Sequence, residues 1–109
     1  MLNNYNLTML TDFYEITMAN GYFQSEIRDS EACFDLFFRR VPDKGGFALM
    51  AGLEQIITYL KNLSFTEEDI EYLRSKNIFC EDFFDYLRSF EFKCDVWSIP
   101  EGYPIFPHE

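Results

Sequence analysis

Residues 10–22, with the sequence LTDFYEITMANGY, carry the most informative pattern in the chain. Apolar residues recur there at three- and four-residue spacing, which predicts a helix over residues 12–23. We expect Thr11 to cap this helix, because a threonine hydroxyl accepts hydrogen bonds from the free N–H groups of a first turn. Gly21 weakens the end of the helix.

Tyr14 is the residue of this stretch whose chemistry points most clearly to a binding role. Successive helical side chains are about 100° apart, so Tyr14 need not enter the same core as Phe13. A tyrosine in a first helical turn presents a flat ring with a hydroxyl tip, which suits stacking on a flat aromatic substrate. Asp12 and Glu15 are three residues apart and share a face. The alternative is an ordinary amphipathic helix with a solvated acidic side.

The rest of the chain predicts a mixed fold. Periodicity and capping signals predict helices at 48–60, from residue 66, and at 81–89. Alternating apolar residues predict strands at 31–40 and 92–99. Turn residues predict a loop at 42–46 and a turn at 100–102, and a short extended return follows at 103–106. The residues expected on the buried helix faces are Leu49, Leu53, Ile56, Ile57 and Leu60, then Ile70 and Leu73, then Phe83, Phe84 and Leu87. We therefore expect an α/β fold of the α+β kind, with helices and a small, mainly antiparallel sheet in one domain over residues 1–109.

Composition narrows the function classes. The 109 residues include 9 Lys and Arg against 19 Asp and Glu, a formal net charge of -10, and 19% are aromatic. The aromatic content excludes a disordered acidic tail. The acidic balance argues against nucleic acid or an anionic membrane as partner, because both are polyanions. The chain lacks an apolar run long enough for a transmembrane helix, and its N-terminus lacks signal-peptide features, so we expect a cytoplasmic protein.

The three cysteines give no metal or catalytic pattern. Cys33, Cys80 and Cys94 are widely spaced, and no CxxC pair is present. We expect three buried thiols in a reducing compartment and no metal site. The single histidine, His108, has no partner in a zinc or Cys–His pattern.

Arg39 and Arg40 form the only adjacent basic pair, between a predicted strand and a Gly-containing loop. Consecutive side chains of a strand point to opposite faces, so Arg39 would share a face with Asp35. Arginine suits phosphate because its planar fork donates two parallel hydrogen bonds. The alternative is a surface ion pair between Arg39 and Asp35.

Five ordered motifs together resemble the N-terminal portion of the nicotinate phosphoribosyltransferase family. They cover nearly the whole chain, although the proteins of that family are much longer. The motifs are LTDFYEITMANGY (10–22), FDLFFRRVP (34–42), GFALMAGLE (46–54), FTEEDIEYL (65–73) and PEGYPIFPHE (100–109). We therefore expect this chain to be the front portion of a longer protein and to be inactive alone.

The resemblance implies an activity and a set of site residues. The family is a group of type II phosphoribosyltransferases that form nicotinate mononucleotide from nicotinate and phosphoribosyl pyrophosphate, with coupled ATP hydrolysis, in NAD salvage. It implies that Tyr14 stacks on the nicotinate ring and that Asp12 lies near the substrate. It also implies that Arg39, or alternatively Arg40, lies near the phosphate or pyrophosphate. His108 is not the histidine that these enzymes phosphorylate.

The resemblance also implies partners and components outside this chain. The family's barrel domain, main phosphoribosyl-binding loop, phosphorylated histidine and Mg²⁺ ligands are expected beyond residue 109. A homodimer with a shared active site is expected. Two alternatives remain: a related enzyme that uses nicotinamide, and a non-catalytic acidic α/β interaction module.

Overall fold

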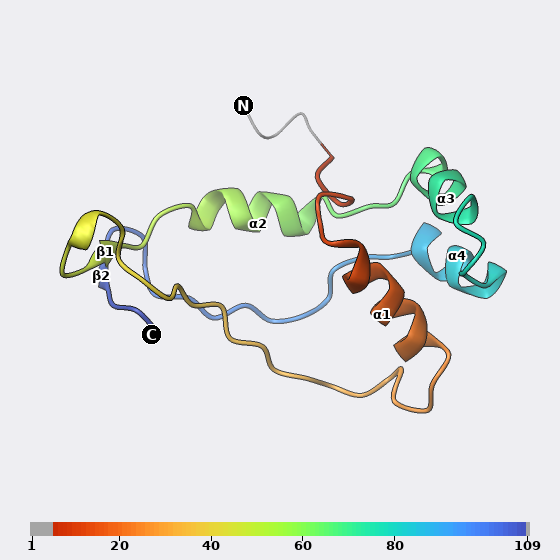
Figure 1. Cartoon of the computed structure of the whole chain (residues 1–109), viewed down its shortest axis with the longest axis horizontal. Coiled ribbons are helices and arrows are strands. Elements are labelled where there is room, and N and C mark those ends of the chain that lie inside the picture. Colours follow the sequence, from red (N-terminus) through yellow and green to blue (C-terminus); the bar gives the residue numbers. More distant parts are fainter. Residues whose placement is uncertain (1–5, 109) are drawn as a thin grey trace.

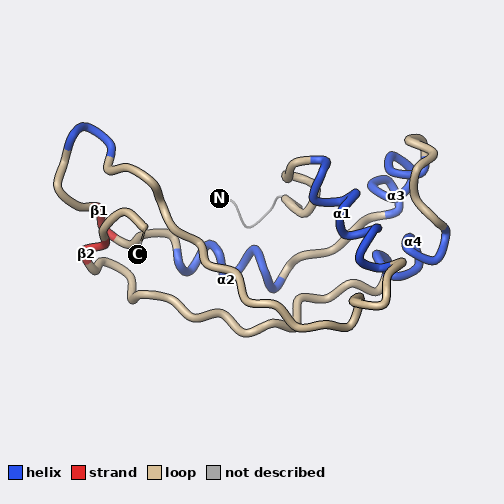
Figure 2. The backbone as a smooth tube through the Cα atoms, turned by 60° about the horizontal axis from the view of Figure 1, so that its bottom comes forward, coloured by secondary structure: helices blue, strands red, loops and turns tan. Residues whose placement is uncertain are grey.

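The computed structural model describes residues 6–108, and the chain has a helical end and a sheet end (Figure 1). The helical end holds α1 (Phe13–Phe23), α3 (Glu67–Arg74) and α4 (Glu81–Arg88); the sheet end holds β1 (Ala48–Leu49) and β2 (Pro104–Ile105). Helix α2 (Leu53–Lys61) lies between the two ends, and long irregular segments join them (Figure 2). The Cα radius of gyration is 16.9 Å, whereas a compact chain of this length has about 13 Å. The fold is therefore elongated.

The core lies at the helical end. Ile70 and Leu73 of α3 are 0% exposed, and α4 adds Phe83, Phe84 and Leu87. A capping box begins α3: Asp69 N–H donates to the Thr66 hydroxyl at 3.1 Å, and Thr66 N–H donates to the Asp69 carboxylate at 2.8 Å. The predicted buried faces of these two helices are confirmed.

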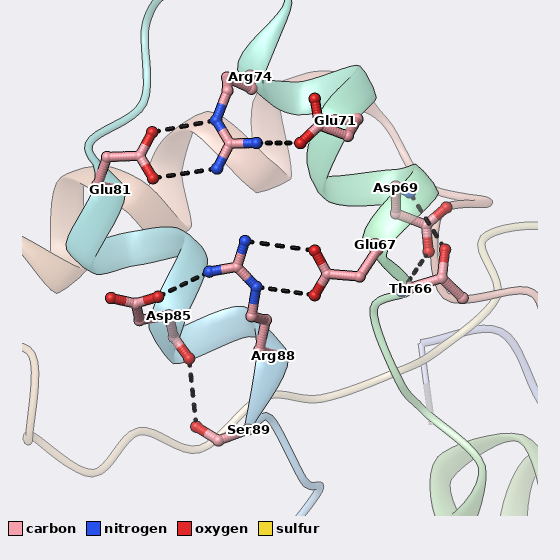
Figure 3. Close-up of polar contacts among 9 residues, drawn as sticks. All are labelled: Thr66, Glu67, Asp69, Glu71, Arg74, Glu81, Asp85, Arg88 and Ser89. Atoms are coloured by element: carbon pink, nitrogen blue, oxygen red, sulfur yellow. Dashed lines mark hydrogen bonds and ion pairs between the residues drawn. The ribbon is translucent and has the colours of Figure 1, made fainter.

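Reciprocal ion pairs join α3 and α4 (Figure 3). Arg88 binds Glu67 at 2.8 Å, and Arg74 binds Glu81 at 3.0 Å. Each pair joins the start of one helix to the end of the other, so the helices are antiparallel. Their hydrogen bonds lower the pKa of both glutamates and raise the pKa of both arginines. Because these ion pairs are exposed, they fix the alignment of the α3–α4 hairpin more than they add to its stability.

Helix α1 packs on this hairpin through Ile16, which is its only buried residue. The prediction that Thr11 caps α1 is wrong. The N-cap is Asp12, which makes no side-chain cap bond, and the Thr11 hydroxyl instead donates to the Glu15 carboxylate. A threonine hydroxyl one position too early reaches a side chain on the first turn rather than the free N–H groups.

The sheet end confirms a small antiparallel sheet but corrects the second helix. Ala48 and Leu49 pair with Ile105 and Pro104 as β1 and β2, so the predicted helix 48–60 begins only at Leu53. Among the described residues, none of α2 is buried, and the predicted buried stripe is wrong. No other described helix lies over α2 (Figure 1), and its apolar side chains are exposed or half-buried, with Ile56 and Ile57 at 43% and 41% exposure.

The predicted strands 31–40 and 92–99 are wrong. Residues 31–38 and 90–100 carry no strand, and Phe34 and Trp97 are 90% and 94% exposed. Alternation defines two faces, but a strand also needs a neighbour to pair with, and neither segment has one here. Cys33 and Cys94 on these segments are exposed and Cys80 is half-buried, which overturns the expected burial of the thiols.

Candidate functional site

The start of α1 borders a shallow, open depression of about 390 Å³ lined by Leu10, Thr11, Asp12 and Glu15. Asp12 precedes the helix in extended conformation, with φ -71° and ψ 140°. Its carboxylate forms no hydrogen bond or ion pair with the rest of residues 6–108, and it is exposed. The depression therefore offers carboxylate oxygens to a polar ligand atom.

Tyr14 lies beside this depression and points away from the core. Phe13 contacts Phe79 edge-on, at a centroid distance of 6.0 Å, and Ile16 is buried. Tyr14 is 59% exposed, and Met18 follows one turn later on the same side of α1. Tyr14 thus lies outside the core, as its position on the helix allows, and its ring is exposed.

The position of this helix start depends on a tether that the sequence did not reveal. Thr8 is buried, and its hydroxyl accepts a hydrogen bond of 3.0 Å from Ser64 N–H in the segment between α2 and α3. The Asn6 amide donates to the Ser64 carbonyl at 2.9 Å, and Thr8 N–H donates to the Asn6 side chain at 3.0 Å. No motif marks Thr8 in the sequence, because its partner is 56 residues away.

Arg39 and Arg40 lie at the sheet end, on a bend after the first extended segment. Both are exposed, and the alternative ion pair between Arg39 and Asp35 does not form among the described residues. The bend is anchored just before them, because His108 N–H donates to the Phe38 carbonyl at 2.9 Å. The rings of Phe37 and His108 also contact, with centroids 5.3 Å apart.

The structure does not bring the predicted site residues together. Tyr14 and Asp12 belong to the helical end, whereas Arg39 adjoins the sheet end on the far side of α2 (Figures 1 and 2). One copy of the chain therefore presents an aromatic surface and a basic surface that are separate.

Within residues 6–108, no three His, Cys, Asp or Glu side chains gather in a way that suits a metal ion. The described helices also include none with the length and apolar character needed to cross a membrane. In the part of the chain that the structure describes, the groups with shifted pKa values belong to the α3–α4 ion pairs, which are structural.

Residues 9–109 match the family described as the nicotinate phosphoribosyltransferase (NAPRTase) N-terminal domain. The nicotinate phosphoribosyltransferase of Bacillus subtilis is 42% identical over 104 residues, which are 95% of this chain and 21% of the relative. A nicotinate phosphoribosyltransferase of Mycobacterium tuberculosis is 39% identical over 101 residues, 93% of this chain and 22% of the relative. That of Bos taurus is 37% identical over 102 residues, 91% of this chain and 19% of the relative. The chain thus spans about a fifth of the length of these relatives.

Proposed function

The chain belongs to the nicotinate phosphoribosyltransferase N-terminal domain family, and from that premise we propose that it serves such an enzyme. The reaction joins nicotinate to phosphoribosyl pyrophosphate, forms nicotinate mononucleotide and releases pyrophosphate, in the salvage of nicotinate to NAD. ATP is hydrolysed as a coupled substrate. The observation that carries this proposal is the match of residues 9–109 to this domain.

In this proposal Tyr14 binds the pyridine ring of nicotinate. Its exposed ring and its direction away from the core support this role. Stacking would hold the ring nitrogen toward the ribose carbon, which lowers the entropic cost of reaching the reactive geometry. Asp12 lies near the substrate at the edge of the depression beside α1.

Arg39 binds the phosphate or pyrophosphate in this proposal, with Arg40 as the alternative. A guanidinium stabilises the negative charge that collects on departing pyrophosphate. The exposure of Arg39 and its lack of an ion pair with Asp35 support an available guanidinium.

We further propose a homodimer in which the two subunits share each active site. The support is the separation of Tyr14 from Arg39 within one copy, together with exposed apolar residues on α1. Met18 and Tyr22 are 47% and 50% exposed and follow Tyr14 at one-turn intervals. An apolar ridge on the side of a helix away from its core is typical of a face that packs against another surface.

The proposal also includes a cellular location, a metal cofactor and the exclusion of two classes of partner. A cytoplasmic location is supported by three free thiols, which are typical of a reducing compartment. Mg²⁺ accompanies the pyrophosphate chemistry, with ligands outside this chain. Nucleic acid and membranes are not partners, in keeping with the charge of -10.

Two observations favour this proposal over its alternatives. The relatives reported above are all named for nicotinate rather than nicotinamide. A self-sufficient interaction module would be compact, whereas this chain is elongated and exposes Phe34, Leu36 and Trp97 almost completely.

A domain replacement tests the proposal. This chain replaces the matched 104-residue segment of the Bacillus subtilis relative, and the purified chimera is assayed for nicotinate mononucleotide formation. The controls are the same relative without that segment and the chain alone. We expect activity only from the chimera. A folded chimera without activity would refute the proposal.

A further inference from the structure

Glu101 lies in a turn at the sheet end, and its carboxylate binds a helix that precedes it by almost 50 residues. One oxygen accepts a hydrogen bond from Gly52 N–H at 3.0 Å, and the other accepts one from Leu53 N–H at 3.1 Å. These two residues are the N-cap and the first residue of α2. Gly52 adopts φ 97°, the left-handed region that favours glycine, and has no side chain with which to cap the helix. Glu101 therefore supplies the cap of α2 from a distant part of the chain.

The segment that begins at Glu101 is held along its length by further bonds. Gly102 N–H donates to the Met50 carbonyl at 2.7 Å, and Met50 N–H donates to the Tyr103 carbonyl at 2.8 Å. β2 then pairs with β1, and His108 N–H reaches the Phe38 carbonyl at 2.9 Å. Residues 101–108 thus form a clamp, fixed at its start by Glu101.

This clamp closes the base of the loop formed by residues 39–47. Phe38, just before the loop, is held by His108, and Ala48, just after it, pairs with Ile105. The loop contains three of the nine basic residues of this acidic chain, namely Arg39, Arg40 and Lys44, against one acidic residue, Asp43. The clamp therefore controls where the one markedly basic segment of the chain is presented.

We propose that Glu101 is a positioning residue for Arg39. Its carboxylate fixes the clamp to α2, and the clamp fixes the two ends of the basic loop, so that the guanidinium is presented to phosphate at low entropic cost. This inference rests on the proposed role of Arg39 in binding phosphoribosyl pyrophosphate. In this proposal Glu101 acts through the backbone N–H groups of Gly52 and Leu53 and not by binding phosphate itself.

Glu101→Gln in the full chain tests whether the Glu101 carboxylate fixes the clamp to α2. Glutamine keeps one acceptor oxygen but turns an amide N–H₂ toward the second backbone donor. Amide hydrogen exchange, resolved by residue, reports the result, and Glu91→Gln is the matched control because it removes the same charge from an exposed position. We expect roughly tenfold faster exchange at Gly52 and Leu53, the size typical of losing a charge-assisted hydrogen bond. His108 should also exchange faster, while the α3–α4 amides serve as an internal standard of intact folding.

The chimera with the Bacillus subtilis enzyme tests whether the clamp positions Arg39. Glu101→Gln should raise the KM for phosphoribosyl pyrophosphate several-fold and leave the KM for nicotinate and kcat unchanged, because Tyr14 lies at the other end of the chain. General loss of structure would instead lower kcat. Faster exchange at Gly52 and Leu53 without faster exchange at His108 would overturn the clamp. Faster exchange at all three with an unchanged KM for phosphoribosyl pyrophosphate would overturn the positioning of Arg39. An inactive chimera carrying the unaltered chain would refute the proposed function and with it the role assigned to Arg39, while the exchange at His108 would still decide whether the clamp exists.

Discussion

If Tyr14 stacks on nicotinate as proposed, Tyr14→Ala should weaken substrate binding and leave the fold intact. The ring is 59% exposed, and the backbone carbonyl of Tyr14 accepts a hydrogen bond from the Thr17 hydroxyl at 2.9 Å. That bond survives the substitution. Alanine is also the better helix former. We therefore expect a free energy of unfolding within about 0.5 kcal/mol of the parent chain.

The expected effect on binding follows from the stacking energy. An aromatic pair contributes about 0.5–1.5 kcal/mol beyond the area that it buries. At about 1.4 kcal/mol per factor of ten, that loss raises the KM for nicotinate about 2- to 12-fold. The KM for phosphoribosyl pyrophosphate should not change, because Arg39 lies at the sheet end.

The assay is steady-state formation of nicotinate mononucleotide by the chimera with Bacillus subtilis, together with thermal unfolding of each variant. Tyr72→Ala is the matched control, since Tyr72 is 52% exposed on α3, away from the α1 face assigned to the homodimer. It should leave the KM for nicotinate unchanged. Equal effects of the two substitutions, or an unchanged KM in Tyr14→Ala, would refute the assignment of ring stacking to Tyr14.

Three further outcomes are expected. Arg39→Ala should weaken the use of phosphoribosyl pyrophosphate in the chimera, and a larger loss from Arg40→Ala would show that the neighbouring arginine has this role. Leu73→Ala should destabilise the chain by about 2–5 kcal/mol in urea unfolding, because the side chain is 0% exposed. Leu36→Ala is the control, and since Leu36 is 89% exposed its loss should change the free energy of unfolding by less than about 0.5 kcal/mol. Similar losses from both substitutions would contradict the placement of the core. Thr66→Ala removes the capping-box hydroxyl and should cost about 1 kcal/mol, measured in the same way, with no change in either KM.

The helical end is predictable from sequence because its signals are local. The Thr66 cap and its Asp69 partner are three residues apart, and Ile70 and Leu73 follow at helical spacing. Nothing distant is needed to form this cap or to decide which face of α3 is apolar. Residues 67–88 accordingly fold much as their pattern predicts.

The sheet end is not predictable in this way, because its contacts join residues far apart in the chain. The start of α2 depends on Glu101, which follows Gly52 by 49 residues. No local pattern signals such a cap, so a helix predicted from periodicity alone extends too far toward Ala48. The alternation in residues 31–40 similarly predicts the faces of a strand but cannot supply the neighbour that would make it one.

The same difference between local signals and long-range contacts applies to the candidate site. The exposure of Tyr14 follows from its place one residue after Phe13 on a helix, which periodicity reveals. The tether between Thr8 and Ser64, and the distance between Tyr14 and Arg39, depend on how the elements are arranged in space. Sequence motifs named the residues, and only the fold shows that one copy of the chain keeps them apart.

The most direct test of the central claim is a crystal structure of the chimera with nicotinate bound. The account predicts that the pyridine ring lies against the ring of Tyr14, with centroids within the roughly 4.5–7 Å typical of aromatic pairs. Nicotinate bound at a site that Tyr14 of neither subunit reaches would contradict it.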